Sequence, residues 1–414
     1  MRILYVSQYF PPEMGAPAAR VYELAKHWVE AGCQVTVLTG FPNHPTGCVP
    51  KEYQRKMWRL SMQERVEGIQ VIRTWLYPSP NRRPVERILG YTSFCVSACL
   101  RGLLLARPDF VIGTSPQLLV GLAGWWISRW KRCPFLFEVR DLWPESLLAS
   151  GIGRESSLLI RALEGLTRFL YRSCDQIVVV TDALKQNLIV KRGLPEERIE
   201  VVENGVEADM FHPEIDVSSF RRSQDLEGRF VVSYIGTLGY AHGLGVILEA
   251  AERLEERCPQ VLFLLVGEGA AKKDLQQRAE KGKLTNIRFL DQQPRETIPL
   301  FVNAADVCLV LLRKAELFST VLPSKMLEVM ACGRPVVLGV DGQARKILDQ
   351  AQAGLFIKPE DPEALAQAVI DLYRDPVIRS RLGENGRRFV VKHYSREQKA
   401  QHYLRILESL KEKG

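Results

Sequence analysis

The clearest chemical pattern in the sequence lies in one run of residues, Leu322–Gly333. Pro323 suits the first turn of a helix and Gly333 suits its end. In such a helix Lys325 and Glu328 stand three residues apart and share a face. A lysine in the first turn opposes the helix dipole, and lysine before glutamate is the weaker order of the two charges. Helix stability therefore explains this run poorly, whereas a negatively charged ligand would explain it well.

A bound anion would be held at that helix start by Lys325, Ser324 and free backbone N–H groups. A diphosphate fits this description. Glu328 lies one turn deeper, where a carboxylate can accept hydrogen bonds from the two hydroxyls of a ribose. We therefore expect a nucleoside diphosphate here, with a surface ion pair between Lys325 and Glu328 as the alternative.

Two turns after apolar runs of the same half add candidates for donor binding. Gly267 and Gly269 follow the run Val261–Val266 and imitate part of a dinucleotide-binding fingerprint without its third glycine. We expect them to line the nucleotide pocket, although a tight strand-to-helix turn explains them equally well. Asp291 and Gln292 follow the next apolar run, in a loop that resembles the base-contacting segment of glycosyltransferase family 4. The resemblance implies that the backbone of this loop reads the base.

The turn after Phe230–Ile235 contains Gly239 and His242, ahead of an expected helix. Backbone N–H groups near Gly239 are candidates for contact with the diphosphate. His242 would help to neutralise that ligand if it were protonated, and is otherwise a polar loop residue. The sequence contains no clear aspartate cluster for a metal, so we expect a site that works without a metal ion or other cofactor.

The first half of the chain offers a second group of candidates. Gly15 precedes an expected helix, where its backbone could approach the donor phosphates or simply form a flexible turn. Arg140, Asp141 and Glu145 follow the apolar run Phe135–Phe137. In an enzyme that transfers a group from a donor to an acceptor, as the resemblance to glycosyltransferase family 4 implies, we expect Arg140 to bind an acceptor phosphate or a donor oxygen. Asp141 and Glu145 would then contact acceptor hydroxyls. A buried network between Arg140 and Asp141 that holds the loop is the alternative.

Two series of short apolar runs would position these residues, and amphipathic stretches separate the runs. This alternation is typical of parallel sheets covered by helices. The first series is Ile3–Val6, Val35–Leu38, Val71–Ile72, Phe110–Ile112, Phe135–Phe137 and Ile177–Val180, and the second is Phe230–Ile235, Val261–Val266, Ile287–Leu290, Val307–Leu312, Val336–Leu338 and Leu355–Ile357.

A chain of 414 residues is long enough for two domains. Periodicity is lost between Asn204 and Gly228, so we predict an N-terminal, acceptor-binding domain over 1–206 and a C-terminal, donor-binding domain over 207–394. The helical segment 395–414 is expected to return to the first domain. Because doubly wound sheets bind ligands at the carboxyl ends of their strands, two facing sheets would put a two-substrate site in a cleft.

The composition indicates a globular protein with an anionic partner. Hydrophobic residues make up 46%, charged residues 25%, and the formal net charge is +8. A phosphate ligand or a membrane surface fits that charge, whereas no nucleic-acid-binding module is recognisable. The nine cysteines contain no CxxC pair and are expected to be reduced thiols. The first apolar run is too short for a secretory signal, so we expect a cytoplasmic protein.

The run Glu328–Val336 resembles the donor-site signature of glycosyltransferase family 4. The resemblance extends to Asn204–Val206 and to Ser7–Glu13, and it covers nearly the whole chain. The segments Gly236–Leu244 and Pro323–Lys325 resemble the fucosamine-transferase-like bacterial branch. The resemblance implies the GT-B fold, with two Rossmann-like domains facing a cleft, and a retaining reaction.

Three departures from the family pattern affect the site. Thr320 stands where the first glutamate of the signature is expected, so the residue that contacts the donor sugar is unassigned. Thr237 and His242 stand where many relatives carry basic residues. In the family pattern, a catalytic histidine precedes the position of Asp141. Arg140 replaces that histidine here.

The resemblance implies transfer of a sugar from a nucleoside diphosphate donor, expected to be UDP-linked, to a polyprenyl-linked acceptor in bacterial surface polysaccharide synthesis. An N-acetylated amino or deoxyamino sugar is the expected cargo, and O-antigen, capsule or exopolysaccharide the expected product. Lys325, Glu328, Arg140 and Asp141 are the catalytic candidates. Because no carboxylate stands out as a nucleophile, we expect the departing diphosphate to take the acceptor proton on the same face. The alternatives are a GT-B-like nucleotide-sugar epimerase and a non-catalytic sugar-nucleotide-binding subunit.

Three segments combine apolar and basic residues in a way that suits either packed helices or a membrane surface. They are Ile88–Ala106, Leu118–Trp130 and Lys51–Arg59. None contains the roughly 20 uninterrupted apolar residues of a spanning helix. Tryptophan beside arginine and lysine suits the lipid headgroup region. A peripheral position on the inner face of the plasma membrane is therefore expected alongside a lipid-linked acceptor.

Overall fold

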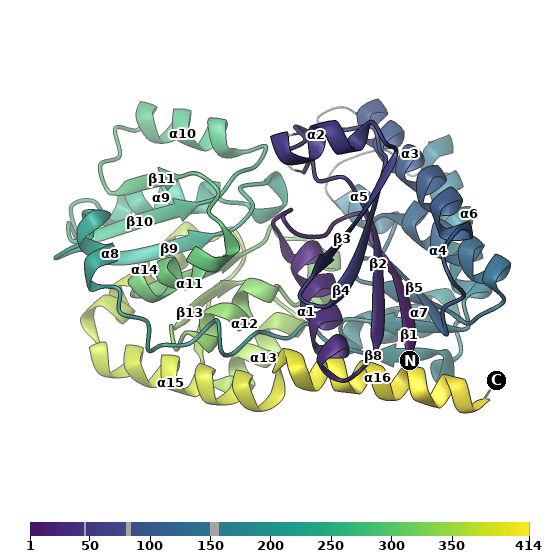
Figure 1. The fold of residues 1–414 in the computed structure, drawn as a ribbon. Coiled ribbons are helices and arrows are strands. Elements are labelled where there is room, and N and C mark those ends of the chain that lie inside the picture. The colour runs from purple at the N-terminus through teal and green to yellow at the C-terminus, as the bar shows by residue number, and fades with distance from the viewer. Residues whose placement is uncertain (45–46, 80–83, 150–156, 414) are drawn as a thin grey trace. The chain divides into compact units, whose positions relative to one another are not determined.

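The computed structural model describes residues 1–44, 47–79, 84–149 and 157–413, and these form two units (Figure 1). Unit 1 contains Met1–Glu203 and Glu397–Gly414, and unit 2 contains Asn204–Arg396. Each unit is an α/β domain built on one largely parallel sheet. All nine cysteines lie in the described part of the chain, and none of them forms a disulfide bond there.

The described residues of unit 1 form one sheet in the order β3-β4-β2-β1-β5-β6-β7-β8. All neighbours are parallel except β3, which pairs antiparallel with β4. The strands are β1 (Arg2–Val6), β2 (Gln34–Gly40), β3 (Ser61–Val66), β4 (Ile69–Thr74), β5 (Phe110–Thr114), β6 (Phe135–Val139), β7 (Gln176–Val179) and β8 (Ile199–Val201).

The helices of unit 1 connect these strands and pack beside the sheet (Figure 1). They are α1 (Ala16–Glu30), α2 (Lys51–Met57), α3 (Pro84–Leu103), α4 (Leu118–Lys131), α5 (Glu145–Ala149), α6 (Leu158–Ser173), α7 (Asp182–Arg192), the short 3-10 helix η1 (Glu196–Arg198) and the C-terminal α16 (Arg396–Lys413).

The C-terminal helix α16 belongs to the core of unit 1, as the sequence predicted. Tyr403, Ile406 and Leu407 are buried in the same apolar cluster as Trp28 of α1. The ring of Trp28 meets that of Tyr403 edge-on at 5.2 Å, and its Nε1–H donates to Ala400 O at 3.1 Å. The last helix therefore completes the hydrophobic core of unit 1, whose other residues come from the first 203 positions.

The described residues of unit 2 form a second, wholly parallel sheet in the order β11-β10-β9-β12-β13-β14. Its strands are β9 (Phe230–Ile235), β10 (Val261–Val266), β11 (Ile287–Leu290), β12 (Val307–Leu311), β13 (Val336–Gly339) and β14 (Gly354–Phe356).

The helices of unit 2 cover both faces of this sheet (Figure 1). They are α8 (Ser218–Ser223), α9 (Gly245–Leu254), α10 (Lys272–Lys281), α11 (Ile298–Ala304), α12 (Ser324–Ala331), α13 (Gln343–Ala351), α14 (Pro362–Arg374) and α15 (Pro376–His393), with the 3-10 helices η2 (Tyr240–His242), η3 (Arg295–Thr297) and η4 (Glu316–Thr320).

Alternation of side chains along the central strands explains the two-sided burial of unit 2. On β10, Leu262 and Leu264 join one buried cluster, while Phe263 and Leu265 join the other. A parallel sheet with helices on both faces requires such continuous apolar strands. The predicted runs of both units match observed strands, and two α/β domains with doubly wound, largely parallel sheets are the architecture that the sequence predicted.

The sequence did not predict two of the strands, β3 and β8. β3 lies at the edge of its sheet and has the polar sequence SMQERV, so it lacks the apolar run that marks the buried strands. β8, also at an edge, has only three residues. Edge strands need less apolar sequence because they are paired on one side only.

Candidate functional site

The start of α12 in unit 2 is the site that the sequence singled out. Pro323 is the N-cap, and no side chain makes a capping hydrogen bond there. Met326 and Leu327 are buried in the core and anchor the helix. Gly333 follows the helix with φ +64°, a left-handed conformation that favours glycine. The helix is therefore fixed by its apolar side, and its first backbone N–H groups have no side-chain cap.

Lys325 extends from this helix start to the end of β9. Its ammonium nitrogen is buried and lies 4.0 Å from the ring centroid of Tyr234, a cation–π contact. That nitrogen makes no hydrogen bond within the part of the chain that the structure describes. Burial lowers the pKa of Lys325 from its ordinary value to about 7, and the nearby carboxylate of Glu328 only partly offsets this effect. A buried ammonium without a hydrogen bond is costly for the folded protein.

Gly236 makes room for the lysine. It has φ +140° and directly follows β9. A Cβ atom at this position would lie 2.6 Å from Lys325 Nζ. Only a residue without a side chain leaves the ammonium in its present place.

Glu328 has a partner other than the one considered from the sequence. Its Oε1 accepts a hydrogen bond from Arg295 Nη1 at 3.0 Å. The guanidinium of Arg295 also lies 5.3 Å from the ring centroid of Phe211. The ion pair therefore joins Glu328 to Arg295, and the alternative of a surface ion pair between Lys325 and Glu328 is wrong. Arg295 was missed, although it directly follows the Asp291–Pro294 loop that the sequence had marked.

The glycines after β10 serve close backbone packing. A Cβ atom on Gly267 would lie 1.9 Å from Gly236 O, and one on Gly269 would lie 2.4 Å from Leu238 O. Leu238 N also donates to Glu268 O at 2.8 Å. The turns after β9 and β10 are thus interlocked, which supports the tight-turn explanation of both glycines.

Asp291 and Gln292 lie on the loop after β11. Lys272 Nζ contacts Asp291 Oδ1 at 2.5 Å and Glu268 Oε1 at 2.5 Å. The ion pair between Lys272 and Asp291 therefore connects the start of α10 to the loop that is predicted to contact the base. Gln292 is half-buried on the same loop. Their contact with a nucleotide stays a prediction.

His242 and Gly239 belong to the short turn around η2. Burial lowers the pKa of His242 to about 3, and the positive charge of Lys325 adds to this effect. His242 Nδ1 lies 3.4 Å from Leu311 O. The Nδ1–H group can donate to Leu311 O, and the lowered pKa favours a neutral imidazole. Contact of His242 with a diphosphate stays a prediction. Gly239 is the N-cap of η2 and has ordinary extended backbone.

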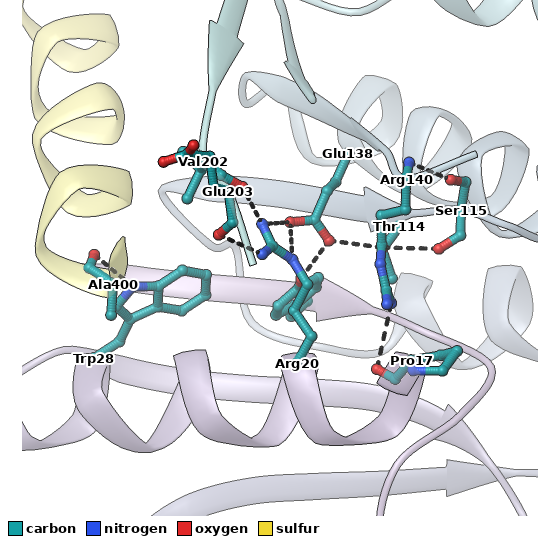
Figure 2. Close-up of polar contacts among 11 residues, drawn as sticks. Pro17, Arg20, Trp28, Thr114, Ser115, Glu138, Arg140, Val202, Glu203 and Ala400 are labelled. Carbon is teal, nitrogen blue, oxygen red and sulfur yellow. Dashed lines mark hydrogen bonds and ion pairs between the residues drawn. The ribbon is translucent and has the colours of Figure 1, made fainter. Parts of the chain in front are cut away.

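In unit 1, Gly15 and Arg140 lie near each other at the start of α1. Gly15 is the N-cap of α1, with φ +124° and no side-chain cap. Arg140 Nη1 donates to Pro17 O at 3.5 Å, and Arg140 N donates to Ser115 Oγ at 2.7 Å (Figure 2). Burial lowers the pKa of Arg140 below its ordinary value. The uncapped helix start and the guanidinium form a second place that suits negative charge.

A buried ion pair between Arg20 and Glu138 lies beside Arg140 (Figure 2). Glu138, at the end of β6, is fully buried and accepts from Arg20 Nε at 3.0 Å and Arg20 Nη2 at 2.8 Å. Tyr5 Oη and Thr114 Oγ1 each donate to its other oxygen at 2.7 Å. Although burial alone would raise it, the guanidinium of Arg20 holds the pKa of Glu138 below its usual value.

Arg20 also binds the segment at which the chain leaves unit 1. Its Nη1 donates to Glu203 O at 3.0 Å and its Nη2 to Val202 O at 2.9 Å. The sequence reading missed Arg20 because it lies mid-helix on α1, where nothing local marks its partners.

Asp141 and Glu145 differ in their surroundings. Asp141 is half-buried, and burial raises its pKa while the adjacent Arg140 opposes the rise. Glu145, at the start of α5, forms an ion pair with Arg192 of α7, which also binds Glu164. The structure therefore ties Glu145 to α7, and acceptor contact by either carboxylate stays a prediction.

The described residues contain no group of three or more histidine, cysteine, aspartate or glutamate side chains that could hold a metal ion. Among the same residues, no helix is both long and apolar enough to cross a membrane.

Two family models match the chain. The model described as glycosyl transferase 4-like domain matches residues 15–205, and the model described as glycosyl transferases group 1 matches residues 216–389. Together they span both units, including the segments around Arg140 and Lys325. The chain is a glycosyltransferase of family 4. Its two GT-B domains are those that the resemblance in the sequence implied.

Individual relatives agree with this assignment. The chain is 25% identical over 383 residues to Escherichia coli WcaI, a protein named for colanic acid biosynthesis, and covers 91% of it. The glycosyltransferase resembles solved structures of Anabaena HepE with UDP-glucose (18% identity, TM-score 0.74) and of WaaG, a glycosyltransferase involved in lipopolysaccharide biosynthesis (18%, 0.70). These alignments cover 99% and 96% of the chain and 100% and 98% of the other proteins. At such identities they support the fold.

Proposed function

We propose that this glycosyltransferase transfers a sugar from a nucleoside diphosphate donor, expected to be UDP-linked, to a polyprenyl-linked acceptor in bacterial surface polysaccharide synthesis, with retention at the anomeric carbon. The observation that carries the proposal is the buried ammonium of Lys325 at the uncapped start of α12. A diphosphate there would supply the hydrogen bonds that the ammonium lacks, and would accept from the first N–H groups of the helix.

The pair of Arg295 and Glu328 supports a ribose position next to the phosphate. Arg295 fixes one oxygen of the Glu328 carboxylate at 3.0 Å. A carboxylate held in this way presents its second oxygen in a defined direction, as recognition of a vicinal diol requires. This is the arrangement proposed for the donor's ribose.

The proposed reaction uses the diphosphate as both leaving group and base. The bond between the anomeric carbon and the diphosphate oxygen breaks, and its electron pair stays on the diphosphate. The acceptor hydroxyl forms the new bond on the same face and gives its proton to the departing diphosphate. Lys325 stabilises the charge that develops, and a preorganised donor of this kind contributes about 3 to 4 kcal/mol. We propose that Arg140 and Asp141 bind the acceptor. We assign no role to Thr320.

WcaI is named for colanic acid biosynthesis and WaaG for lipopolysaccharide biosynthesis, and both support the polysaccharide part of the proposal. HepE with UDP-glucose supports the uridine nucleotide. The segments Gly236–Leu244 and Pro323–Lys325 support an amino or deoxyamino sugar through their resemblance to the fucosamine-transferase-like branch. A cytoplasmic protein held at the inner face of the membrane would meet such an acceptor.

The proposal is tested by incubating the protein with bacterial lipid extract and a panel of nucleotide sugars, followed by mass spectrometry of lipids and nucleotides. We expect one lipid to gain one sugar residue, together with release of nucleoside diphosphate, and no product with Lys325→Met. A converted nucleotide sugar without lipid would instead indicate an epimerase. Binding without any turnover would indicate a non-catalytic subunit, and a covalent sugar on a carboxylate of the protein would exclude the same-face route.

A further inference from the structure

Helix α3 of unit 1 exposes an apolar stripe along most of its length. The exposed side chains are Val85, Ile88, Leu89, Val96, Leu100 and, just past the helix end, Leu104. Their spacing of three, four or seven to eight residues places them on one side of the helix. Leu100 is 61% exposed and Leu104 is 76% exposed. A helix on the surface of a soluble protein usually turns such a stripe inward, and here Phe94 and Ala98 already fill the inner side.

Two tryptophans of α4 lie exposed beside it. Trp126 and Trp130 are one turn apart, and their rings stack with centroids 6.1 Å apart and planes 6° from parallel. The opposite side of α4, with Gly121, Gly124 and Ser128, is buried. The sequence had left open whether this segment packs in a core or meets a membrane. The structure shows one buried side and one exposed aromatic side.

Helices α3, α4 and α6 pack next to one another, so their exposed sides belong to one surface (Figure 1). Lys131 of α4 donates to Leu103 O at the end of α3 at 2.7 Å. Trp125 of α4 meets Phe169 of α6 edge-on with centroids 4.8 Å apart, and Phe169 is itself exposed. We call the exposed apolar side chains of these three helices the α3–α4–α6 surface.

Basic residues border this surface. Arg129 and Arg132 lie exposed at the end of α4, and Arg161, Arg168 and Arg172 lie exposed on α6. The acidic residues of the three helices are Glu86 and Glu164, both half-buried. The border therefore has an excess of positive charge.

The neighbouring segment Arg55–Leu60 adds further exposed apolar side chains and further positive charge. Trp58 is 89% exposed and Leu60 is 66% exposed, with exposed Arg55, Lys56 and Arg59 around them. Hydrogen bonds connect this segment to α3, because Trp75 N donates to Leu60 O at 2.9 Å while Trp75 O accepts from Ser97 Oγ at 2.5 Å.

We propose that the α3–α4–α6 surface, with the adjoining Arg55–Leu60 segment, docks unit 1 on an anionic lipid bilayer. The apolar stripe would enter the boundary between headgroups and acyl chains, and the tryptophans would lie at headgroup depth. The arginines and lysines would remain among anionic headgroups. The proposal deepens the proposed function and rests on it for its purpose, since a lipid-linked acceptor would be presented at such a bilayer.

Charge favours a bilayer over a second copy of the chain. Two copies that met through this surface would bring their basic borders against each other, and like charges across an interface oppose association. An anionic bilayer instead complements both the apolar stripe and the basic border. A self-interface is the alternative that the experiment must be able to detect.

The experiment measures sedimentation of the full chain with vesicles. One set contains phosphatidylcholine only, and the other contains about one third phosphatidylglycerol. We expect binding to the anionic vesicles and little to the neutral ones. Leu100→Glu with Leu104→Glu should weaken anionic binding by tenfold or more, on the order of the loss expected when two leucines no longer leave water. Arg55→Gln, Lys56→Gln and Arg59→Gln should weaken it by roughly fivefold for each charge removed.

Val377→Glu is the matched control, because Val377 of α15 is exposed to the same 76% as Leu104. It should leave vesicle binding unchanged. The proposal is overturned if neutral vesicles bind as well, if the leucine double variant binds like the parent, or if Val377→Glu weakens binding equally. A parent dimer that the double variant dissociates, with no vesicle binding, would assign the surface to a second copy and also overturn it.

Donor binding separates this proposal from the proposed function. UDP affinity, measured by calorimetry without lipid, should be the same in the parent and in the leucine double variant. Loss of vesicle binding with intact UDP binding would support docking through this surface. A parent that binds anionic vesicles but no nucleotide would contradict the proposed function and leave the docking surface standing.

Discussion

The two units each bury a charged side chain near the carboxyl ends of their strands, but they treat it differently. In unit 1, the carboxylate of Glu138 receives hydrogen bonds from Arg20, Tyr5 and Thr114. In unit 2, the ammonium of Lys325 faces the ring of Tyr234 and has no hydrogen-bond partner among the described residues. A fully bonded buried charge has no capacity left for a ligand, whereas an unbonded one destabilises the fold until a ligand binds it. We therefore interpret Glu138 as a structural residue and propose Lys325 as a ligand-binding residue.

The largest expected effect comes from breaking the satisfied pair. Glu138→Gln would leave the buried guanidinium of Arg20 without its counter-charge, and should destabilise unit 1 by about 3 to 5 kcal/mol. All seven tryptophans lie in unit 1, so tryptophan fluorescence in urea reports the unfolding of this unit alone. Thr114→Val removes one hydrogen bond to the same carboxylate and should cost about 1.5 kcal/mol. Equal shifts for the two variants would show that the charge of Glu138 contributes nothing beyond its hydrogen bonds.

Removing the buried charge of Lys325, which has no hydrogen-bond partner among the described residues, should increase the stability of the protein instead of decreasing it. Lys325→Met keeps an apolar stem and should stabilise unit 2 at pH 7 by on the order of 2 kcal/mol, because the buried ammonium no longer forms. Since the pKa of Lys325 is lowered from 10.5 to about 7, the unfolded chain binds this proton more tightly than the folded chain. The penalty is therefore full below pH 7 and shrinks as pH rises toward 10.5.

Circular dichroism during urea unfolding at pH 7 and at pH 10.5 tests this sign. The gain from Lys325→Met should be present at the first pH and nearly absent at the second. Lys272→Met is the control in the same unit, because that ammonium already binds Glu268 and Asp291 and its loss should give no stabilisation. A destabilised Lys325→Met at pH 7 would contradict the contrast between the two buried charges.

The same lysine should make nucleotide affinity depend on pH. A bound diphosphate raises the pKa of Lys325, so binding above pH 7 takes up a proton, and affinity for UDP should fall by up to about tenfold per pH unit there. His242 does not titrate in this range because its pKa is about 3. Calorimetry between pH 6 and about 9 measures the slope. Lys325→Met should bind weakly at every pH and show no such slope, and a slope that survives the substitution would assign the titration to another group.

The smallest expected effect concerns the half-buried pair of Arg295 and Glu328. Arg295→Gln should change the stability of unit 2 by less than about 1 kcal/mol, since partly exposed ion pairs contribute little. It should nevertheless weaken UDP binding, because the Glu328 carboxylate loses its orientation toward the ribose. Glu328→Gln should do the same with the fold intact. Inorganic pyrophosphate, which lacks a ribose, is the control ligand, and equal losses for pyrophosphate and UDP would remove Glu328 from the ribose position.

Much of the fold followed from local patterns. The runs Phe230–Ile235, Val261–Val266 and Ile287–Leu290 are the observed strands β9, β10 and β11 to the residue. The residues of β10 are all apolar because both faces of the sheet are covered there. β3 was missed because its sequence is polar, and β8 was missed because it has only three residues.

The candidate site was predictable in part. The start of α12 was recognised from Pro323, Lys325 and Gly333, because capping preferences and the helix dipole act within one or two turns. The partner of Glu328 was not, since Arg295 lies 33 residues away in sequence. The same holds for Arg20 and Glu138, 118 residues apart.

The sequence by itself therefore determined most of the strands, the family and the helix start that suits an anion. These depend on periodicity and capping, which are local properties of the chain. Only the tertiary structure decided which buried charge is satisfied and which is not, and that the apolar stripe of α3 faces outward. Those outcomes depend on which distant side chains packing brings within hydrogen-bond distance and which surfaces it leaves uncovered.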